Sequence, residues 1–252
     1  MSEDIMNSFH FSVDDVLPAL IEVTDRNIPL TENKFFNELR FIYEQYGVKT
    51  GLNIFYSHVI DGRRRFLSEV RDLKEEIKDG WIYFAPHAVD FDTPPYSQNI
   101  KNQIMMLDNI MGEIDRIAGT FKTKSVRFHH YSECYEISKN ILSYGFNEMF
   151  VTDKLVGSHR LPKSEAEKIL DKGFIYRNDL KITRTNFRVE NLANDAVGED
   201  EIIEMFKKNL DKYSRIVIYS HEYEYEREDV NIMLRDTMNI LVNKLGLKNE
   251  RP

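Results

Sequence analysis

The sequence predicts an α/β fold built on parallel strands, and two features of the 252-residue chain lead to this prediction. Short apolar runs alternate with amphipathic helical patterns along the chain, as in repeated βαβ units. Several of these runs end in Asp or His, and parallel α/β folds place their functional groups at the carboxyl ends of the strands. A barrel and an open doubly wound sheet both agree with the pattern.

The predicted strands are short runs rich in β-branched and aromatic residues, and the predicted helices are longer segments with apolar residues at helical spacing. The strands are 9–16, 51–57, 81–87, 125–131, 147–152 and 215–220, with two further β-like pieces at 173–177 and 182–189. The helices are 32–46, 68–79, 98–117, 134–142, 164–170, 201–210 and 228–245. Gly80 and Gly119 follow two of these helices and favour helix termination there.

One domain covering residues 1–252 is expected, because no linker, repeat or low-complexity tract divides the chain. The net charge of −8 argues against non-specific nucleic-acid binding. Neither a signal peptide nor an apolar run long enough to cross a bilayer is visible, so no membrane insertion is expected. Cys134 is the single cysteine and fits a reducing compartment, which makes a cytoplasmic location the prediction.

The first predicted strand ends in two adjacent carboxylates, Asp14 and Asp15. Two acids side by side raise the pKa of one of them unless a cation neutralises the pair. A helix N-cap is the alternative role for one Asp, but two of them directly after an apolar strand favour a chemical role. In a regular strand their side chains alternate, so one is expected to face the site and the other to support it.

Histidines lie at or near the ends of three other predicted strands, at His87, His129 and His221. Imidazole is a common metal ligand, and Asp together with His at several strand ends predicts one metal site. Alternation along 125–131 places His129 on the same face as Arg127 and turns His130 toward a packing helix. Burying an Arg and a His on one strand face costs free energy unless both side chains contact a polar site.

These residues, in this order, resemble the motifs of the polysaccharide deacetylases, the NodB-like carbohydrate esterases. Residues 12–16 match the paired-Asp motif, Arg127 matches the Arg of the fourth strand, and residues 218–221 match the final His motif. The resemblance implies a distorted (β/α)7 barrel that removes acetyl groups from N-acetylated sugars with one divalent metal, zinc being the first expectation. It implies Asp14 as the catalytic base and His221 as the general acid, with Arg127 beside them in the catalytic group.

The second motif of the family, His-x-x-x-His, is matched only in part. His87 takes the first place, but Phe91 stands where the second His is expected. Three alternatives remain open: Asp90 or Asp92 is a ligand, His129 reaches in from the next strand, or metal binding is weak. The resemblance implies Asp15, His87 and His129 as the metal ligands.

The chain is similar, more closely still, to uncharacterised deacetylase-like bacterial proteins, some of them encoded with surface-polysaccharide genes. These proteins share a Thr-x-x-Arg-x-Glu segment and a His-Glu pair, which correspond here to residues 185–190 and 221–222. The resemblance assigns Arg188 and Glu222 to substrate binding, with Arg188 on an oxyanion or a substrate carboxylate. An ordinary ion pair with a neighbouring Glu is the competing interpretation of Arg188.

The function implied by the resemblance is metal-dependent removal of an acyl group from an N-acetylated sugar or a surface-glycan precursor, a small molecule or an oligosaccharide. The main alternative is a barrel without this activity that binds glycans or assists assembly in surface-polysaccharide synthesis. A metal-dependent phosphoesterase is a third interpretation, in which Arg127 and Arg188 bind the anionic group.

Overall fold

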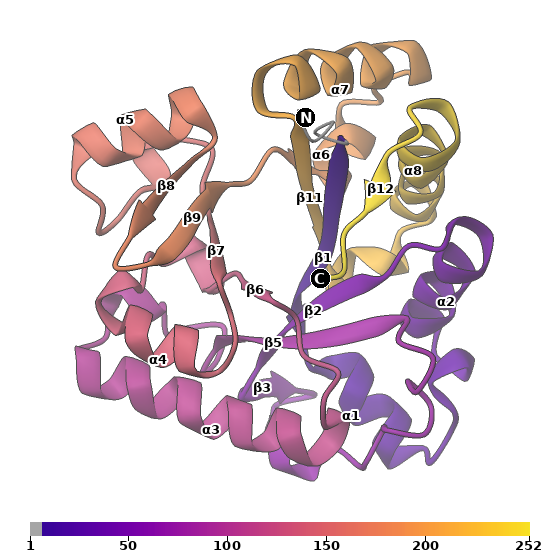
Figure 1. The fold of residues 1–252 in the computed structure, drawn as a ribbon. Helices are drawn as coiled ribbons and strands as arrows, with labels where there is room; N and C mark the ends of the chain where they lie inside the picture. Colours follow the sequence, from indigo (N-terminus) through magenta and orange to yellow (C-terminus); the bar gives the residue numbers. More distant parts are fainter. Residues whose placement is uncertain (1–6) are drawn as a thin grey trace.

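The computed structural model describes residues 7–252 and contains a ring of strands with helices on its outside (Figure 1). The strands are β1 (Ser8–Val16), β2 (Thr50–Phe55), β3 (Ser57–Ile60), β4 (Arg63–Phe66), β5 (Ile82–Ala88), β6 (Ser125–Val126), β7 (Glu148–Val151), β8 (Phe174–Arg177), β9 (Leu180–Arg184), β10 (Phe187–Arg188), β11 (Arg215–His221) and β12 (Lys248–Asn249). The α-helices are α1 (Pro18–Asp25), α2 (Lys34–Tyr46), α3 (Ile100–Ala118), α4 (Ser138–Ser143), α5 (Lys163–Lys172), α6 (Val189–Asn194), α7 (Glu199–Tyr213) and α8 (Glu228–Asn239).

The ring is formed by parallel pairing of strands that are distant in the sequence. One run of the ring has the order β10-β11-β1-β2-β5, and the other has the order β6-β7-β9. A parallel bridge between Phe84 and Lys122 joins β5 to the segment that leads into β6. β9 and β10 belong to one segment, 180–188, which pairs first with β7 and then with β11. With this segment counted once, seven strand positions close the ring, and the predicted distorted (β/α)7 barrel is confirmed.

The two faces of β1 show how the sequence forms this barrel. Phe9, Phe11 and Val13 are fully buried and belong to the main hydrophobic cluster. The alternate residues Ser12 and Asp14 point the other way and contact a buried arginine. One face of the strand therefore packs in the core, as an apolar face must, while the other makes a polar barrel interior near the carboxyl ends.

The two longest predicted helices of the first half are present with clear end signals. Asn33 caps α2 by accepting a hydrogen bond from the Phe36 N–H at 3.2 Å, and Gly47 ends the helix with a left-handed φ of 68°. Asn99 caps α3 in the same way, with the Asn102 N–H at 2.9 Å. These caps fix the helices that follow β1 and β5 around the ring.

The predicted helix 68–79 is wrong. The structure has a 3₁₀ turn and then irregular turns over this stretch, although its apolar residues are buried as their spacing indicated. The backbone of the segment makes only isolated turn hydrogen bonds within itself and also bonds to α3. The Leu73 N–H donates to the carbonyl of Ile117, and the Arg116 side chain donates to the carbonyls of Leu67 and Val70. The helical spacing of the apolar residues in 68–79 therefore reflects their burial beside α3 and not a helix.

Helix α1 and the hairpin β3–β4 are not predicted by the patterns above. The hairpin turn consists of Asp61 and Gly62, with φ values of 50° and 74°. Two consecutive positive φ values are the mark of a type I′ turn, for which Asp-Gly is a preferred pair. The Asp61-Gly62 pair is therefore a turn signal in the sequence, although the three arginines that follow it are not typical of a strand.

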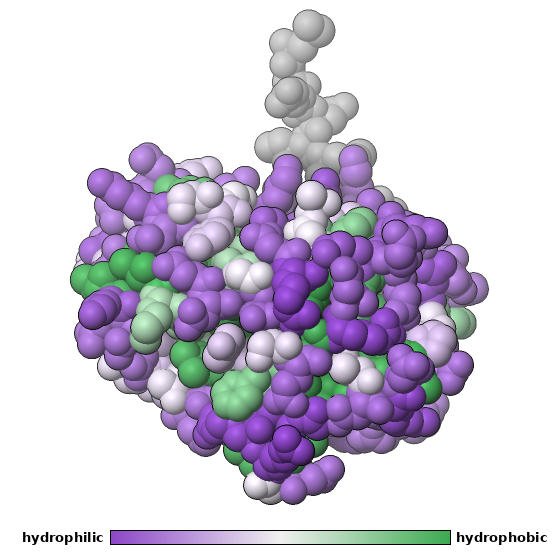
Figure 2. All heavy atoms as spheres, turned by 90° about the horizontal axis from the view of Figure 1, so that it is seen from below, coloured by the Kyte–Doolittle hydropathy of each residue, from purple (hydrophilic) through white to green (hydrophobic). Residues whose placement is uncertain are grey.

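The face of the molecule seen from below in Figure 1 is mainly hydrophilic, with hydrophobic residues in small patches (Figure 2). Within residues 7–252, no helix is both long and apolar enough to cross a membrane.

Candidate metal centre and active site

A β-bulge at the end of β1 brings both aspartates to the mouth of the barrel. Asp15 has a left-handed φ of 64°, and the register between β1 and β2 shifts between Val13 and Val16. Asp is among the few residues that tolerate this conformation. The bulge breaks the alternation expected for a regular strand, so Asp14 and Asp15 line the same cavity instead of facing opposite sides.

Asp14 is held inside the barrel by two donors, one on β2 and one directly after β6. Asn53 on β2 donates to its Oδ1 at 2.7 Å. Nη1 of Arg127 lies 3.1 Å from Oδ1 and 3.2 Å from Oδ2, and it also reaches Ser12 Oγ at 3.1 Å. The Arg127 guanidinium is only 1% exposed and stacks on the ring of Tyr219 at 4.2 Å. These contacts fix the Asp14 carboxylate in one orientation.

Asp15, His87 and His129 bring three ligand atoms together next to Asp14. His87 Nε2 lies 3.1 Å from Asp15 Oδ1, His129 Nδ1 lies 3.3 Å from the same oxygen, and the two nitrogens are 3.2 Å apart. All three side chains are buried. Burial acts to raise the pKa of Asp15, but the two neighbouring imidazoles hold it well below its ordinary value. Asp15 is therefore a carboxylate here.

The outer nitrogen of each imidazole is fixed by a backbone carbonyl. His87 Nδ1 donates to the carbonyl of Arg127 at 2.6 Å, and His129 Nε2 donates to the carbonyl of Phe91 at 3.0 Å. Because a carbonyl can only accept, these nitrogens carry the protons, and in a neutral ring the inner nitrogens present lone pairs. Such outer contacts are typical of metal-bound histidines.

The three atoms fit a divalent cation. Ligands at about 2.0 Å from a tetrahedral zinc ion lie about 3.3 Å from one another, close to the observed separations. Two lone pairs and a carboxylate oxygen that face one another in a buried site also repel unless a metal ion or an added proton lies among them. Asp15, His87 and His129 thus form a group that can hold a metal ion.

The geometry favours one of the three alternatives left by Phe91. Asp90 bonds to Arg64 at 3.0 Å and lies outside the ligand group, whereas His129 supplies the third ligand atom. Phe91 itself contributes its carbonyl to His129. Phe91 stands where the family pattern has its second histidine, and its carbonyl orients His129, which follows the next strand in the chain.

His221, at the end of β11, lies beside Asp14 on the neighbouring strand and lines the same cavity. Its Nδ1 bonds to Glu190, which is 1% exposed and also accepts from Arg188 Nε at 2.6 Å. Burial acts to raise the pKa of Glu190, but the hydrogen bond with His221 and the charge of Arg188 lower it below its ordinary value. An ionised Glu190 thus orients the His221 ring and leaves Nε2 available to a ligand.

Seven of the eight residues predicted from the sequence line one cavity of about 420 Å³. They are Asp14, Asp15, His87, Arg127, His129, Arg188 and His221. Arg188 makes the ion pair with a neighbouring Glu that was its competing interpretation, and it still lines the cavity. The arrangement places a metal-ligand group, an anchored carboxylate and an anchored imidazole around one space.

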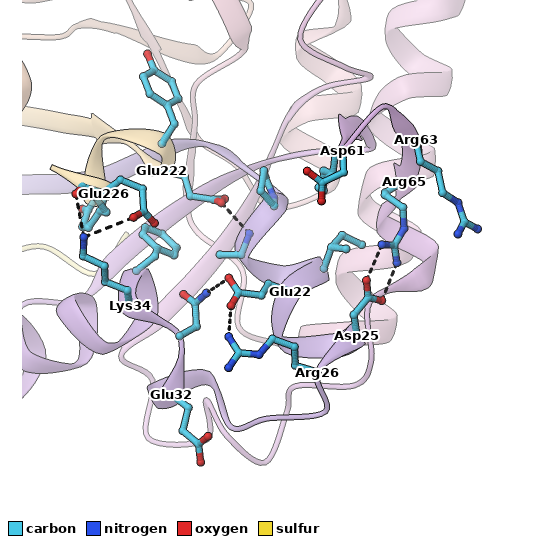
Figure 3. Close-up of a pocket in the computed structure, with 18 residues that line it drawn as sticks. Glu22, Asp25, Arg26, Glu32, Lys34, Asp61, Arg63, Arg65, Glu222 and Glu226 are labelled. Carbon is cyan, nitrogen blue, oxygen red and sulfur yellow. Dashed lines mark hydrogen bonds and ion pairs between the residues drawn. The ribbon is translucent and has the colours of Figure 1, made fainter.

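Glu222 requires a correction, because it does not line this cavity. Its carboxylate caps helix α1, accepting from the Leu17 N–H at 3.0 Å and the Ala19 N–H at 2.7 Å. Figure 3 shows Glu222 in a second, larger cavity of about 920 Å³. There many charged side chains pair with one another, as Asp25 does with Arg65. The structure thus gives Glu222 a helix-capping role outside the cavity that the other seven predicted residues line.

The Glu222 cap leads to a prediction on stability. Burial raises the pKa of Glu222 to about 8 from its ordinary 4.5, against the lowering effect of the two N–H bonds. The folded state therefore binds the proton more tightly, and this contribution to stability is present below pH 4.5 and lost as the pH rises toward 8. Compared with Glu222→Gln, the wild type should lose up to about 1.4 kcal/mol of unfolding free energy per pH unit in this window.

Urea unfolding of both proteins at several pH values between 4.5 and 8 measures this difference. Glu226→Gln is a matched control, since the Glu226 side chain is 83% exposed. Parallel stability curves for wild type and Glu222→Gln would contradict the prediction.

His130 does not point toward a packing helix as alternation predicted. β6 ends at Val126, and residues 129–131 form a tight turn in which His130 and Tyr131 both have a φ of 53°. His130 is exposed and its ring lies against that of His129. The alternation rule placed His129 correctly in the cavity, although the strand that justified it ends earlier.

Several residues of the cavity were not singled out from the sequence. Tyr131, Lys154 and Tyr219 line the cavity, and Asn53 and Glu190 bond to the lining residues Asp14 and His221. Asn53 could have been found, because it is a polar residue inside an otherwise apolar predicted strand. Lys154 gives no local signal, since it lies in a loop whose path depends on the rest of the fold.

Comparison with known proteins supports the fold. No family model matches the chain, and no curated protein matches it in sequence. Among solved structures, the 4-α-glucanotransferase from Thermococcus litoralis is 12% identical with a TM-score of 0.58, and the alignment covers 97% of this chain and 39% of the other. The chain thus spans well under half of that enzyme.

Two further structures match over most of this chain. The GH57 branching enzyme from Thermococcus kodakaraensis is 8% identical with a TM-score of 0.57, covering 96% of this chain and 69% of the other. A protein assigned as a polysaccharide deacetylase from Mycobacterium smegmatis is 11% identical with a TM-score of 0.53, covering 94% and 85%. At the level of the fold, the resemblance to the NodB-type polysaccharide deacetylases is confirmed.

Proposed function

We propose that this protein is a metal-dependent hydrolase that removes an acetyl group from an N-acetylated sugar or a surface-glycan precursor in the cytoplasm. The observation that carries the proposal is the group of Asp15, His87 and His129, whose three ligand atoms lie within 3.3 Å of one another beside Asp14. Zinc is the first candidate, because two imidazoles and one carboxylate form a ligand set that catalytic zinc sites use.

A divalent ion held by these residues supplies Lewis acidity, which lowers the pKa of water and polarises an acyl oxygen. Asp14 is placed to accept a proton from the attacking water, since its Oδ2 has a single donor, Arg127, and keeps a free lone pair. Arg127 is buried and acts through Asp14 as a positioning residue. His221, oriented by Glu190, is placed to donate a proton from Nε2 to the leaving amine.

Glycoside hydrolysis is less well supported, although the similar structures include a 4-α-glucanotransferase and a GH57 branching enzyme. That reaction uses two carboxylic groups that flank the bond at a defined separation. Among the described residues that line the cavity, the acids are Asp14 and Asp15, adjacent in the chain and engaged by Arg127 and the histidines. This arrangement favours acyl transfer to water at a metal centre.

Replacing Asp14 by Asn tests the proposal. The amide keeps the size of the side chain but cannot take a proton, so acetate release should fall by about 10²- to 10⁴-fold, the usual contribution of a general base. Metal content should stay near that of the wild type. The measurement is enzymatic detection of acetate from N-acetylglucosamine oligomers and sugar phosphates, with metal content determined by mass spectrometry.

Asp90→Asn is the matched control, because Asp90 is an acid next to the cavity that binds Arg64. A wild-type protein that releases no acetate from any of these compounds, fully loaded with zinc, cobalt or manganese, would favour the glycan-binding alternative. Equal turnover by the wild type and Asp14→Asn would refute the assigned base.

A further inference from the structure

A polar annex of about 200 Å³ opens from the candidate active site. The annex and the main cavity have five lining residues in common: Tyr131, Thr152, Lys154, Arg188 and Tyr219. The remaining lining residues come mainly from the segment between β9 and α6 and from the loop after β7. A ligand bound at Asp14 and His221 can therefore extend into this annex.

Two cations lie where the cavity and the annex meet. Lys154 has no acidic partner among residues 7–252. Arg188 donates from Nε to Glu190 at 2.6 Å and from Nη2 to the Tyr223 hydroxyl at 3.3 Å. Within the described chain its Nη1 has no hydrogen-bond partner, so the outer edge of the guanidinium is available to a ligand.

The chain carries a net charge of −8, yet the main cavity is lined by three cationic and two acidic side chains apart from histidines. Arg127 is matched by Asp14, and Asp15 belongs to the metal-ligand group. Because Arg188 is paired with Glu190, the one lining cation without an acidic partner among the described residues is Lys154, and it can attract an anion toward the free N–H groups of Arg188.

The neutral groups of the annex complement an oxygen-rich ligand. The Thr185 hydroxyl is buried, with 2% of the residue exposed, and has no partner among the described residues. Asn186 Oδ1 accepts from the Val217 N–H at 2.6 Å, which leaves its amide N–H groups available. Asp153 is the one acid among the described lining residues, and it can accept from a sugar hydroxyl.

We propose that the substrate carries an acidic group, a phosphate or a carboxylate, which binds between Lys154 and Arg188 while the acetylated sugar lies at Asp14 and His221. The inference rests on the proposed function for the position of the acetylated sugar. Charge-assisted hydrogen bonds from Lys and Arg select such oxyanions over neutral groups. Lys154 and Arg188 thus determine specificity for acidic sugars.

Isothermal titration of the metal-free full-length chain tests this inference without turnover. The probes are N-acetylglucosamine 1-phosphate, N-acetylmuramic acid and neutral N-acetylglucosamine. At least one acidic sugar should bind about tenfold more tightly than the neutral sugar, and Lys154→Gln should remove most of that preference. Lys154→Arg should restore it, and whichever acidic probe binds more tightly identifies phosphate or carboxylate as the group.

Lys163→Gln on α5 is the matched control, because the Lys163 side chain is 81% exposed and does not line either space. Equal or undetectable binding of acidic and neutral sugars, or a full preference in Lys154→Gln, overturns the inference. Acetate release from neutral sugars without any acidic preference would refute the inference alone. Tight binding of an acidic sugar without acetate release from any substrate would refute the proposed function alone.

Discussion

Asp15→Asn is expected to lower the affinity for zinc by more than about 100-fold. Loss of a residue that only supports a metal ligand already lowers metal affinity by about 10- to 100-fold, and Asp15 is a proposed ligand itself. The substitution removes the only charged atom of the ligand group and leaves two neutral imidazoles. Asn is the informative choice, because Asp15 has a φ of 64° and Asn tolerates that backbone as well as Asp does. The fold should therefore persist while metal binding is lost.

Competition with a chromophoric chelator measures the affinity, and mass spectrometry measures the metal that is retained through purification. His130→Asn is a matched control, since His130 also has a left-handed φ, of 53°, and lines the same cavity without belonging to the ligand group. It should keep the affinity of the wild type. Unchanged zinc affinity in Asp15→Asn would show that the ligand set is wrong.

Arg127→Met is expected to have the largest effect on stability. The substitution leaves the buried Asp14 carboxylate without its cation, a change that typically costs about 3–5 kcal/mol of unfolding free energy. Arg127 also has two nitrogens without hydrogen-bond partners in the described chain, so its place in the barrel depends on Asp14 and on stacking against Tyr219. Met fills much of the same volume and isolates the electrostatic part of the loss.

The double variant Asp14→Asn with Arg127→Met separates the charge effect from packing. Because it buries no unpaired charge, it should recover part of the stability lost by Arg127→Met alone. Urea unfolding of the two single variants and the double variant completes the cycle. Arg40→Met is the control on the surface, where exposed ion pairs contribute about 0–1 kcal/mol. A strictly additive double variant would contradict the coupling of Asp14 and Arg127.

The positions at the barrel mouth could be predicted because they follow from local patterns. Apolar runs mark the strands, and parallel strands gather their carboxyl ends, so Asp14, His87 and His221 were expected to meet. The bulge at Asp15 was not visible, since Asp adopts extended and left-handed backbones alike, and only the pairing of β1 with β2 selects between them.

The remaining differences come from contacts between distant segments. Glu222 was placed in the site because it follows His221, but the N–H groups that it binds, on Leu17 and Ala19, are more than 200 residues away. The stretch 68–79 has helical spacing, yet the carbonyls of Val70 and of the preceding Leu67 accept from Arg116 on α3. Local sequence patterns do not contain these distant partners. Neither the capping role of Glu222 nor the non-helical form of 68–79 could therefore be predicted from the sequence alone.

The position of β1 between β2 and β11 has a consequence for how the chain folds. One edge of β1 finds its partner 38 to 39 residues later, whereas the other edge, Ser8 to Asp14, pairs with Arg215 to His221. During synthesis the first strand therefore keeps an open edge until nearly the whole chain has emerged. Such non-local pairing slows folding and leaves an aggregation-prone edge in the meantime. Asp14 and His221, the two side chains proposed to transfer protons, come from these two strands, so they meet only once β1 and β11 have paired.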